Sequence, residues 1–417
     1  MKILGEIQFP GDKSLSHRAI MLASIAKGES CIYNTPKSRD VLATINCLRL
    51  CGADIQRDED EIKVTGSMIK NPGNKLNCDN SGTTARLLLG LLSGQNILAH
   101  LYGDQSLSKR PMDRVIDPLK EIGVDITSNN KHLPIQIKNI RLDKIGYNIP
   151  FPSAQVKSCM IFAALGCNEA SNIQGRINTR DHLERMLCYL SSDGIAYTDD
   201  MIKIYPDKIN INCFKMDLPG DVSSASFFIA LACLMRGSKL IINNILLNKH
   251  RLGFIETLKL MGANIIISKK RVKFNESVGT VTVVGDRELS PCNILSSKIP
   301  SMIDELPILS LVCAHVNGIS TIEGVGELRY KESNRYKATI KILSNMGVDV
   351  GKHKNDGFII KGKNKLYNTN NLDCENDHRL AMMISVAQIV SKNNVDYHEC
   401  INVSFPGFKS AINKVLI

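Results

Sequence analysis

The stretch SSASFFIALACLMRG at residues 223–237 decides the fold, because segments of the same character recur five more times along the chain. Each has a small or polar start, a mostly apolar middle and then a breaker, which is typical of a helix buried on nearly all sides. The other five are SHRAIMLASIAKG (16–28), TTARLLLGLLSG (83–94), SAQVKSCMIFAALG (153–166), DELPILSLVCAHVNG (304–318) and DHRLAMMISVAQIVS (377–391). Such a recurrence predicts one supersecondary unit used six times.

A second pattern alternates with the first. It has the form Leu-x-x-x-Gly followed by small, apolar and β-branched residues, and its glycines are Gly52, Gly123, Gly194, Gly262 and Gly347. The segment before each glycine is amphipathic, as in RDVLATINCLRLCG (39–52), and predicts a helix that a left-handed glycine ends. Short strands follow, as in ANIIISKKRVKF (263–274).

Each unit is therefore expected to run helix, strand, helix, strand, strand. Three copies form a domain of ordinary size, so the chain predicts two lobes with three units each. One lobe holds repeats 1–3 at residues 13–219, and the other holds repeats 4–6 at residues 220–417 together with residues 1–12. The N-terminal strand MKILGEIQF (1–9) is expected to pair into the far lobe, which gives two chain crossings.

Composition limits the class of protein. With 43% hydrophobic and 22% charged residues, the chain is typical of a soluble globular protein. It has no run of 18 apolar residues and no signal peptide at its start, so we expect a cytoplasmic protein without membrane contact. The 13 cysteines are scattered without a CxxC pair and predict buried thiols in a reducing compartment.

The net charge of +11 calls for anionic partners. Nucleic acid is not favoured, because the lysines are spread over the chain, Trp is absent and no Arg/Lys-rich block stands out. Basic residues instead stand at the starts of four buried helices, where the helix dipole disfavours them unless an anion joins them. These residues are Lys13, Arg18, Arg86, Lys157 and Arg379. Ordinary capping by Ser, Thr or Asp is the alternative for any single start, but the recurrence predicts a site for several anionic groups between the lobes.

Two further segments belong to the same zone. The basic stretches 109–114 and 329–335 lead into second helices, and Asp304 and Glu305 open the fifth buried helix. Asp304 and Glu332 are candidates for general acid or base, although a carboxylate among cations equally serves to orient its neighbours. The nine histidines show no ligand spacing, so we expect no metal site, and the phosphate-loop and serine-hydrolase signatures are absent.

Eight short motifs carry a family resemblance over nearly the full length. They are PGDKSLSHRA (10–19), DNSGTTAR (79–86), KRPM (109–112), SAQVKS (153–158), RDHLE (180–184), IDELP (303–307), KESNR (331–335) and NDHR (376–379). In this order they resemble the 5-enolpyruvylshikimate-3-phosphate synthase family, in particular its class II branch. The resemblance implies an α/β fold of two inside-out barrels made of six βαβαββ units. It also implies transfer of the enolpyruvyl group of phosphoenolpyruvate to the 5-hydroxyl of shikimate 3-phosphate, with release of phosphate.

The same resemblance assigns roles to individual residues. Catalysis would rest on Asp304, Glu332 and Lys13. Shikimate 3-phosphate would contact Lys13, Ser14, Arg18, Ser153, Ala154, Gln155, Arg180, Asp304 and Lys331. Phosphoenolpyruvate would contact Lys13, Gly82, Arg110, Gln155, Arg335 and Arg379. No metal or organic cofactor is implied, and a monomer with these two small-molecule substrates is expected.

Two alternatives and two departures remain. The enolpyruvyl transferase that acts on UDP-N-acetylglucosamine would carry a GAKN-type start and a loop cysteine, whereas this chain has GDKS and no cysteine at 109–112. The other alternative is a non-catalytic repeat protein that binds anions. Asn334 stands where family members often have Asp, and Val403 replaces a Lys near phosphoenolpyruvate. Gly82 is the small residue of inhibitor-sensitive members, so the class II pattern does not decide glyphosate tolerance.

Overall fold

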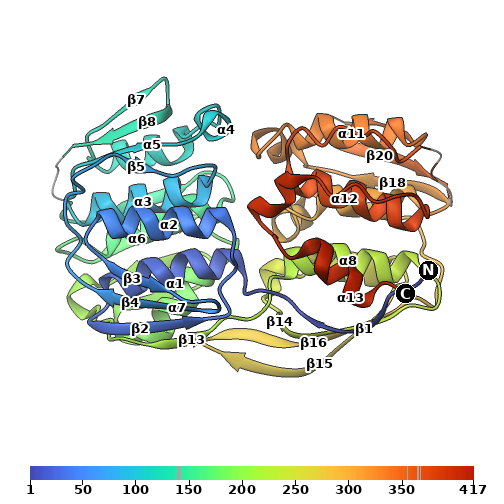
Figure 1. Ribbon diagram of the computed structural model, residues 1–417. Coiled ribbons are helices and arrows are strands. Elements are labelled where there is room, and N and C mark those ends of the chain that lie inside the picture. Colours follow the sequence, from blue (N-terminus) through green and yellow to red (C-terminus); the bar gives the residue numbers. More distant parts are fainter. Residues whose placement is uncertain (139–141, 355, 364–365, 367) are drawn as a thin grey trace. The chain divides into compact units, whose positions relative to one another are not determined.

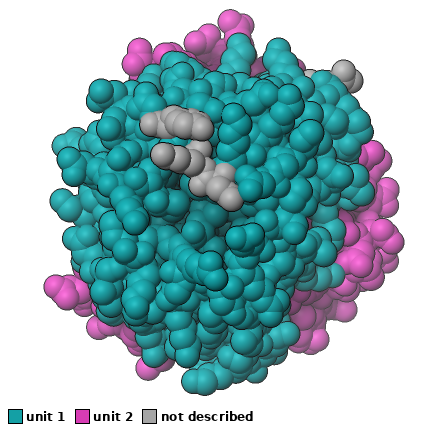
Figure 2. All heavy atoms as spheres, turned by 90° about the vertical axis from the view of Figure 1, so that its right-hand side faces the viewer, with its two compact units in different colours: residues 1–10, 219–272, 277–417 teal, residues 11–218, 273–276 magenta. Residues whose placement is uncertain are grey.

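The computed structural model describes residues 1–417 except 139–141, 355, 364–365 and 367, and its elements are labelled in Figure 1. The chain divides into two compact units, coloured in Figure 2. Unit 1 comprises residues 1–10, 219–272 and 277–417, and unit 2 comprises residues 11–218 and 273–276. The chain thus changes unit after Pro10 and Leu218, one or two residues before the expected crossings. Residues 273–276 differ from the expectation, because they join the unit of repeats 1–3.

Unit 2 holds three four-stranded sheets of one topology. Their strand orders are β13-β2-β4-β3, β5-β6-β8-β7 and β9-β10-β12-β11. In each sheet the first pair is parallel and the others are antiparallel. The strands are β2 (Gly28–Tyr33), β3 (Asp54–Arg57), β4 (Glu61–Gly66), β5 (Leu76–Asn77), β6 (Ala99–Tyr102), β7 (Ile126–Asn129), β8 (His132–Ile137), β9 (Gly146–Ile149), β10 (Ser171–Gly175), β11 (Ile195–Tyr197), β12 (Met201–Ile204) and β13 (Lys215–Asp217).

Unit 1 repeats this topology in two sheets, with the orders β1-β14-β16-β15 and β17-β18-β20-β19. The strands are β1 (Leu4–Gln8), β14 (Lys239–Leu246), β15 (Asn264–Lys273), β16 (Glu276–Val284), β17 (Asn293–Ile294), β18 (Gly318–Ile322), β19 (Asp349–His353) and β20 (Gly357–Gly362). The last residue of β15 and the first of β16 belong to the hairpin tip that joins unit 2.

The first strand of each unit's first sheet comes from a distant part of the chain. β1 pairs in parallel with β14, so Leu4 faces Lys239, and β13 pairs in parallel with β2. The prediction that the N-terminal strand pairs with the later repeats is confirmed (Figure 1). The first sheet of each unit is therefore complete only when its distant strand, β1 or β13, has paired.

The six recurrent apolar segments form helices with almost completely buried faces. They are α1 (Lys13–Ile25), α3 (Gly82–Gly94), α6 (Ala154–Ala164), α8 (Val222–Leu234), α10 (Leu306–Ala314) and α12 (His378–Val390). In unit 2, α3 and α6 approach closely. A Cβ at Gly90 would lie 2.0 Å from the carbonyl oxygen of Cys159, and one at Gly94 would lie 2.4 Å from that of Ala163. Glycine here lets two helix backbones touch.

The second helices are amphipathic as predicted. They are α2 (Arg39–Leu50), α5 (Asp113–Glu121), α7 (His182–Leu190), α9 (Gly253–Leu260) and α11 (Arg335–Asn345), and a short α4 (Gln105–Ser108) precedes α5. Gly52, Gly123, Gly262 and Gly347 have positive φ, as expected of helix-ending glycines. The prediction was wrong for Gly194, which closes a 3-10 turn. A Cβ there would lie 2.3 Å from Cδ1 of Ile209, so close packing requires this glycine.

The sixth unit departs from the repeat. It contributes α12 and α13 (Phe408–Val415), but among the described residues its segments form no four-stranded sheet. Residues 391–407 contain consecutive asparagines and a Pro-Gly pair in place of an alternating apolar run, which disfavours strands. The α/β class and the helix-centred units are as predicted, with five such sheets in the described part of the chain.

The expectations about membrane contact and cysteine chemistry can be compared with the helices and the thiols of the structure. No helix among the described residues is both long and apolar enough to cross a membrane. All 13 cysteines lie in the described part of the chain and are free thiols. Ten of them are buried, but Cys213 is exposed and Cys188 and Cys292 are half-buried, so the prediction of buried thiols fails at these three.

Candidate functional site

The start of α1 in unit 2 presents Lys13 beside a carboxylate. Asp12 caps the helix by accepting a hydrogen bond from the Leu15 amide at 2.9 Å. The Lys13 Nζ lies 2.6 Å from Oδ2 of Asp40, which is the second residue of α2, and the two side chains are 20% and 11% exposed. Lys13 is thus held at the rim of the buried core with its ammonium group oriented. No local pattern marks Asp40 as a partner of Lys13, because the two residues lie 27 positions apart.

Arg18 lies one turn further along α1 and is 3% exposed. Its Nη1 donates to the carbonyl of Ser14 at 2.9 Å, and its Nη2 donates to Oγ of Ser158 on α6 at 2.8 Å. The predicted pair Ser14 and Arg18 is therefore brought together with the third buried helix. Both oxygens are neutral acceptors that orient the guanidinium.

Two arginines converge on the start of α3. Ser81 caps this helix, and its first residue is Gly82. A Cβ at Gly82 would lie 2.7 Å from Nη1 of Arg86 and 3.1 Å from Nη1 of Arg110, so a side chain there would push the guanidinium groups from their positions. Arg110 is 6% exposed and donates to Oδ1 of Asn80 at 2.9 Å. Free backbone N–H groups, a helix dipole and two guanidinium groups together form a cradle for a small anion.

The start of α6 adds polar groups to this cradle. Ser153 is the N-cap and accepts from the Val156 amide, and Ala154 and Gln155 are the first two helical residues. Gln155 accepts from Nη1 of Arg86 at 3.0 Å and donates to the hydroxyl of Thr83 at 3.2 Å. Gln155 thus links the third helix start to the second. The prediction placed Gln155 in both substrate sites, and it lies beside the Gly82 cradle.

Lys157 does not belong to the anion-binding group, and that prediction was wrong. Its side chain is 2% exposed and its Nζ lies 2.7 Å from Oε1 of Glu184, which is equally buried. It also donates to the carbonyls of Ile177 at 2.8 Å and Thr179 at 3.2 Å. An ammonium group enclosed by a carboxylate and two carbonyls connects parts of the fold and is not available to bind an anion.

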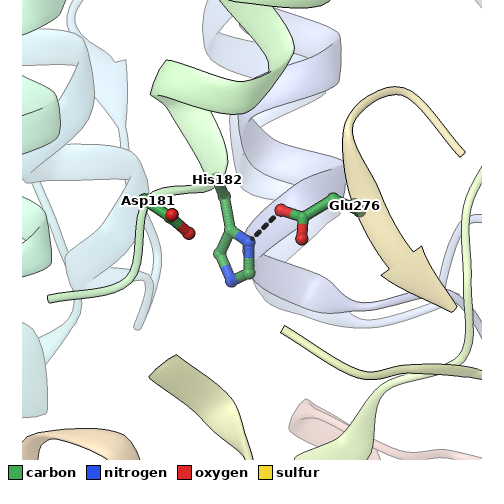
Figure 3. Close-up of side chains that lie close together, drawn as sticks. All are labelled: Asp181, His182 and Glu276. Carbon is green, nitrogen blue, oxygen red and sulfur yellow. Dashed lines mark hydrogen bonds and ion pairs between the residues drawn. The ribbon is translucent and has the colours of Figure 1, made fainter. Parts of the chain in front are cut away.

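Arg180 lies in the loop between β10 and α7 and is half-buried. The residues after it form a cluster with the hairpin tip, in which Asp181, His182 and Glu276 each place a potential ligand atom within 4.8 Å of the others (Figure 3). Arg185 already lies 2.9 Å from Asp181 and 3.9 Å from Glu276. Because a guanidinium supplies the positive charge, we interpret this cluster as an ion-pair network rather than a metal centre.

The fifth buried helix in unit 1 is preceded by the predicted acid. Asp304 lies before the N-cap Glu305 of α10. Its Oδ1 lies 3.3 Å from Nζ of Lys331 and 3.7 Å from Nη1 of Arg335. The structure therefore brings together three of the predicted site residues, with the Asp304 side chain 16% exposed.

Arg335 is the first residue of α11 and is surrounded by carboxylates. It forms ion pairs with Glu332 at 2.5 Å, with Asp377 at 2.8 Å and with Asp304. Burial alone would lower the pKa of Arg335, but the charges of Asp377, Glu332 and Asp304 raise it above its ordinary value. Burial likewise opposes ionisation of Asp377, yet Arg335 holds its pKa below the usual value. Sequence reasoning treated Asp377 only as a helix start and missed this partner.

Arg379 stands at the start of α12 in the same unit. Asp377 is the N-cap of that helix and accepts from the Arg379 amide at 2.9 Å. The Arg379 side chain is 8% exposed, and among the described residues its buried Nη1 has no hydrogen-bond partner. A buried guanidinium N–H without an acceptor is costly, so this group is suited to an incoming anion.

Two departures noted in the sequence have plain structural counterparts. Asn334 is the N-cap of α11, and its side chain accepts from the Lys337 amide at 3.1 Å. An amide there performs the capping that an Asp would perform. Val403 is the last residue of a 3-10 turn, Glu399–Val403, and is half-buried. It brings no charge to the part of unit 1 near α12.

Comparisons with known proteins give a uniform result. The family model described as EPSP synthase (3-phosphoshikimate 1-carboxyvinyltransferase) matches residues 1–412. A protein of Petrotoga mobilis named 3-phosphoshikimate 1-carboxyvinyltransferase is 40% identical over 99% of this chain and 97% of its own length. A protein of the same name from Thermodesulfovibrio yellowstonii is also 40% identical, over 98% and 96%.

Solved structures agree with the sequence comparison. An EPSP synthase from Acinetobacter baumannii superposes with a TM-score of 0.86 at 32% identity, covering 99% of this chain and 96% of that one. The enolpyruvyl transferase NikO from Streptomyces tendae shares the fold alone, with a TM-score of 0.76 at 15% identity over 99% and 95%. The chain belongs to the EPSP synthase family.

Proposed function

We propose that this chain is a 3-phosphoshikimate 1-carboxyvinyltransferase. It transfers the enolpyruvyl group of phosphoenolpyruvate to the 5-hydroxyl of shikimate 3-phosphate and releases inorganic phosphate. Membership of the family over the full length supports this activity, and the named relatives carry the same activity in their names. NikO, an enolpyruvyl transferase, is the more distant match.

The observation that carries the proposal is the cradle at Gly82. Two guanidinium groups converge on the helix start at Gly82, where an added Cβ would lie 2.7 Å from Nη1 of Arg86 and 3.1 Å from Nη1 of Arg110. Phosphoenolpyruvate brings a phosphate and a carboxylate, and charge-assisted hydrogen bonds from arginine suit both groups. We assign Gly82, Arg110, Gln155 and Lys13 of unit 2 to phosphoenolpyruvate.

The remaining binding residues are proposed by unit. In unit 2, shikimate 3-phosphate contacts Lys13, Ser14, Arg18, Ser153, Ala154, Gln155 and Arg180. In unit 1, Asp304 and Lys331 contact shikimate 3-phosphate, and Arg335 and Arg379 contact phosphoenolpyruvate. The last assignment is supported by Nη1 of Arg379, which has no hydrogen-bond partner in the described part of the chain.

The proposed chemistry has two steps. In the first, Asp304 accepts the proton of the 5-hydroxyl as its oxygen attacks C2 of phosphoenolpyruvate, while Glu332 protonates C3 to give a tetrahedral intermediate. In the second, the methyl group returns a proton to Glu332, the C2–O bond to phosphate breaks, and the proton held by Asp304 leaves with the phosphate. Lys331, 3.3 Å from Asp304, orients that carboxyl group. Lys13 stabilises the charge that develops on the phosphoenolpyruvate portion.

The direct test is a coupled assay of phosphate release with purified protein. Turnover is expected with phosphoenolpyruvate and shikimate 3-phosphate, and far less with unphosphorylated shikimate. Turnover with UDP-N-acetylglucosamine in place of shikimate 3-phosphate would point to the alternative transferase. Release with neither acceptor would contradict the proposal.

A glycine pair tests the cradle itself. Gly82→Ala is expected to raise the KM for phosphoenolpyruvate by about tenfold or more, because the added methyl displaces two anion-binding guanidinium groups. Gly73→Ala is the matched control, since a Cβ there meets nothing within 4 Å. An unchanged KM in Gly82→Ala would move the phosphoenolpyruvate site elsewhere.

We also propose that the protein is a monomer and that it does not bind nucleic acid. Every assigned residue comes from one chain, so no second copy is needed for the site. Light scattering should give the mass of one chain, and a dimer that loses activity on dilution would contradict this. The positive charge is assigned to phosphate and carboxylate groups, so salt-dependent binding of DNA or RNA should be weak.

A further inference from the structure

The loop that carries Arg180 is held on its N-terminal side by a buried cation. Lys157 of α6 donates to the carbonyls of Ile177 and Thr179, the latter directly before Arg180. Its ion pair with Glu184 of α7 ties this contact to the helix that follows the loop. The backbone before Arg180 is therefore fixed by a charged group that does not reach the surface.

The C-terminal side of the loop is held by an unusual contact. His182, the first residue of α7, lies with its Nδ1 2.6 Å from Oε1 of Glu276, and both side chains are 0% exposed. Asp181, the N-cap residue, does not cap the helix with its side chain but pairs with Arg185 at 2.9 Å. Figure 3 shows the three side chains gathered beside the start of α7.

Glu276 reaches this place on the tip of the β15–β16 hairpin. The tip turns through Phe274 and Asn275, both with positive φ. It docks on α7 by two hydrogen bonds between Asn275 and Arg185, at 2.7 and 3.3 Å, and by an edge contact of Phe274 with Tyr189. The tip comes from strands whose other residues belong to unit 1. Its contacts converge on the helix that begins two residues after Arg180.

Stability alone gives little reason for a fully buried carboxylate at this point. Desolvating an ionised group is costly, and apolar residues of similar volume often stabilise a protein as well or better. Such contacts do, however, fix one geometry, because a buried carboxylate tolerates few alternative partners. A site that must hold a guanidinium in one position requires that property.

We infer that Glu276 and His182 are positioning residues that fix the Arg180 loop for the phosphate of shikimate 3-phosphate. The inference rests on the proposed function, because it takes Arg180 as a ligand of that phosphate. Glu276 does not touch the substrate; it acts through His182 and the start of α7. Losing it should therefore weaken one substrate's binding and leave the chemical step nearly intact.

The test measures both KM values and kcat for four proteins. Glu276→Ala is expected to raise the KM for shikimate 3-phosphate about tenfold, with the KM for phosphoenolpyruvate and kcat changed by less than about twofold. Glu276→Gln keeps an oxygen that accepts from His182 and should restore most of the affinity. Lys273→Ala is the matched control, because it removes the tip's other ion pair, with Asp217, and should leave all three constants unchanged.

A double-mutant cycle with Arg180→Ala separates positioning from general loosening. If Glu276 acts through Arg180, then Glu276→Ala should have almost no further effect on the shikimate 3-phosphate KM in the Arg180→Ala background. Additive effects, or equal rises in both KM values, would overturn the inference. Should Glu276→Ala fail to fold, His182→Ala, which breaks the same contact from its other side, is judged by the same criteria. A wild-type protein without turnover would overturn the proposed function, and with it this inference.

Discussion

The cations of the two units differ in their partners. In unit 2, Arg18, Arg86 and Arg110 donate to hydroxyl, amide and carbonyl oxygens. In unit 1, Arg335 lies among the carboxylates of Asp304, Glu332 and Asp377. Lys331 forms an ion pair with Asp304 as well. A neutral acceptor orients a guanidinium, whereas a buried guanidinium lowers the pKa of a carboxylate beside it, as Arg335 does for Asp377. Arginine thus meets neutral acceptors at the Gly82 cradle of unit 2, whereas Arg335 of unit 1 lies among carboxylates.

This contrast agrees with the proposed division of labour. Unit 2 holds most of the residues assigned to phosphate and carboxylate groups of the substrates. Unit 1 holds Asp304 and Glu332, the two groups assigned to proton transfer. Proton transfer needs carboxylates in a defined ionisation state, and the neighbouring cations help to set that state.

The largest expected effect is on stability, at Arg335. Arg335→Leu leaves the fully buried Asp377 without its cation, which should lower the free energy of unfolding by about 3–5 kcal/mol. Lys361→Ala, which breaks an exposed pair with Asp349 in the same unit, is the control and should have a far smaller effect. Chemical denaturation of the three proteins measures both. A small loss in Arg335→Leu would remove the contrast between the units.

The pH dependence sharpens this prediction. Arg335 lowers the folded-state pKa of Asp377, so the stability from this group is present above about pH 4, the range of an unperturbed Asp, and is lost as pH falls below it. In Arg335→Leu, burial instead raises that pKa, and the folded state takes up a proton on acidification. The stability gap between wild type and variant should therefore narrow from pH 7 towards pH 4.

The next effect is on the rate, at Asp304. Asp304→Ala is expected to lower kcat by about 10²-fold or more, roughly 2.7 kcal/mol, while both KM values change much less. Pre-steady-state and steady-state phosphate release measure the loss. If kcat stayed near normal and only substrate binding weakened, Asp304 would belong with the anion-binding residues, and Glu332 would become the better candidate for the base.

Arg379 tests whether unit 1 also binds a substrate anion. Its buried Nη1 has no hydrogen-bond partner among the described residues. Arg379→Ala therefore removes a ligand for an anion and leaves no carboxylate without its cation. We expect the KM for phosphoenolpyruvate to rise by an amount equivalent to roughly 1.5–3 kcal/mol, the range for a hydrogen bond to a charged group. The KM for shikimate 3-phosphate serves as the internal control. Equal rises in both would argue against this assignment.

The smallest effect concerns acid stability in unit 2. His17 is fully buried, its Nδ1 lies 2.7 Å from the hydroxyl of Thr44, and burial lowers its pKa to about 3. Between pH 6.5 and about 3 the unfolded chain binds a proton that the folded chain does not, so stability falls as pH is lowered. Wild type should lose roughly 1.6 kcal/mol more than His17→Asn between pH 6.5 and 5. Parallel pH profiles would contradict this.

The sequence predicted most of the fold because the signal was local. A helix that is apolar all round is recognisable within a dozen residues, and the glycine that ends the next helix lies close to it. Gly194 escaped prediction because its contact with Ile209 is not local. The missing sheet of the sixth unit does have a local sign, the asparagines and the Pro-Gly pair of residues 391–407, which the repeat pattern of the helices outweighed.

The candidate site was harder to predict, because partners decide what a charge does. Lys157 and Arg86 both stand near helix starts, yet Glu184 encloses one and Gln155 orients the other. Glu276 lies 94 residues from His182 in sequence and joins it only through the docked hairpin. Residue type and spacing indicate which groups gather at a site, but not which of them are neutralised there.

The exchange of first strands has a consequence for how the protein is made. The amide of Ile3 bonds Ser238, 235 residues further along the chain, and β1 pairs with β14 in the same region. At roughly 5–20 residues per second, β1 leaves the ribosome on the order of 10 to 50 seconds before its partner strand exists. By then every strand of the three sheets of unit 2 has been synthesised. The first strand to emerge is thus among the last to pair, and until then it is an open edge that nascent-chain factors must keep from aggregating.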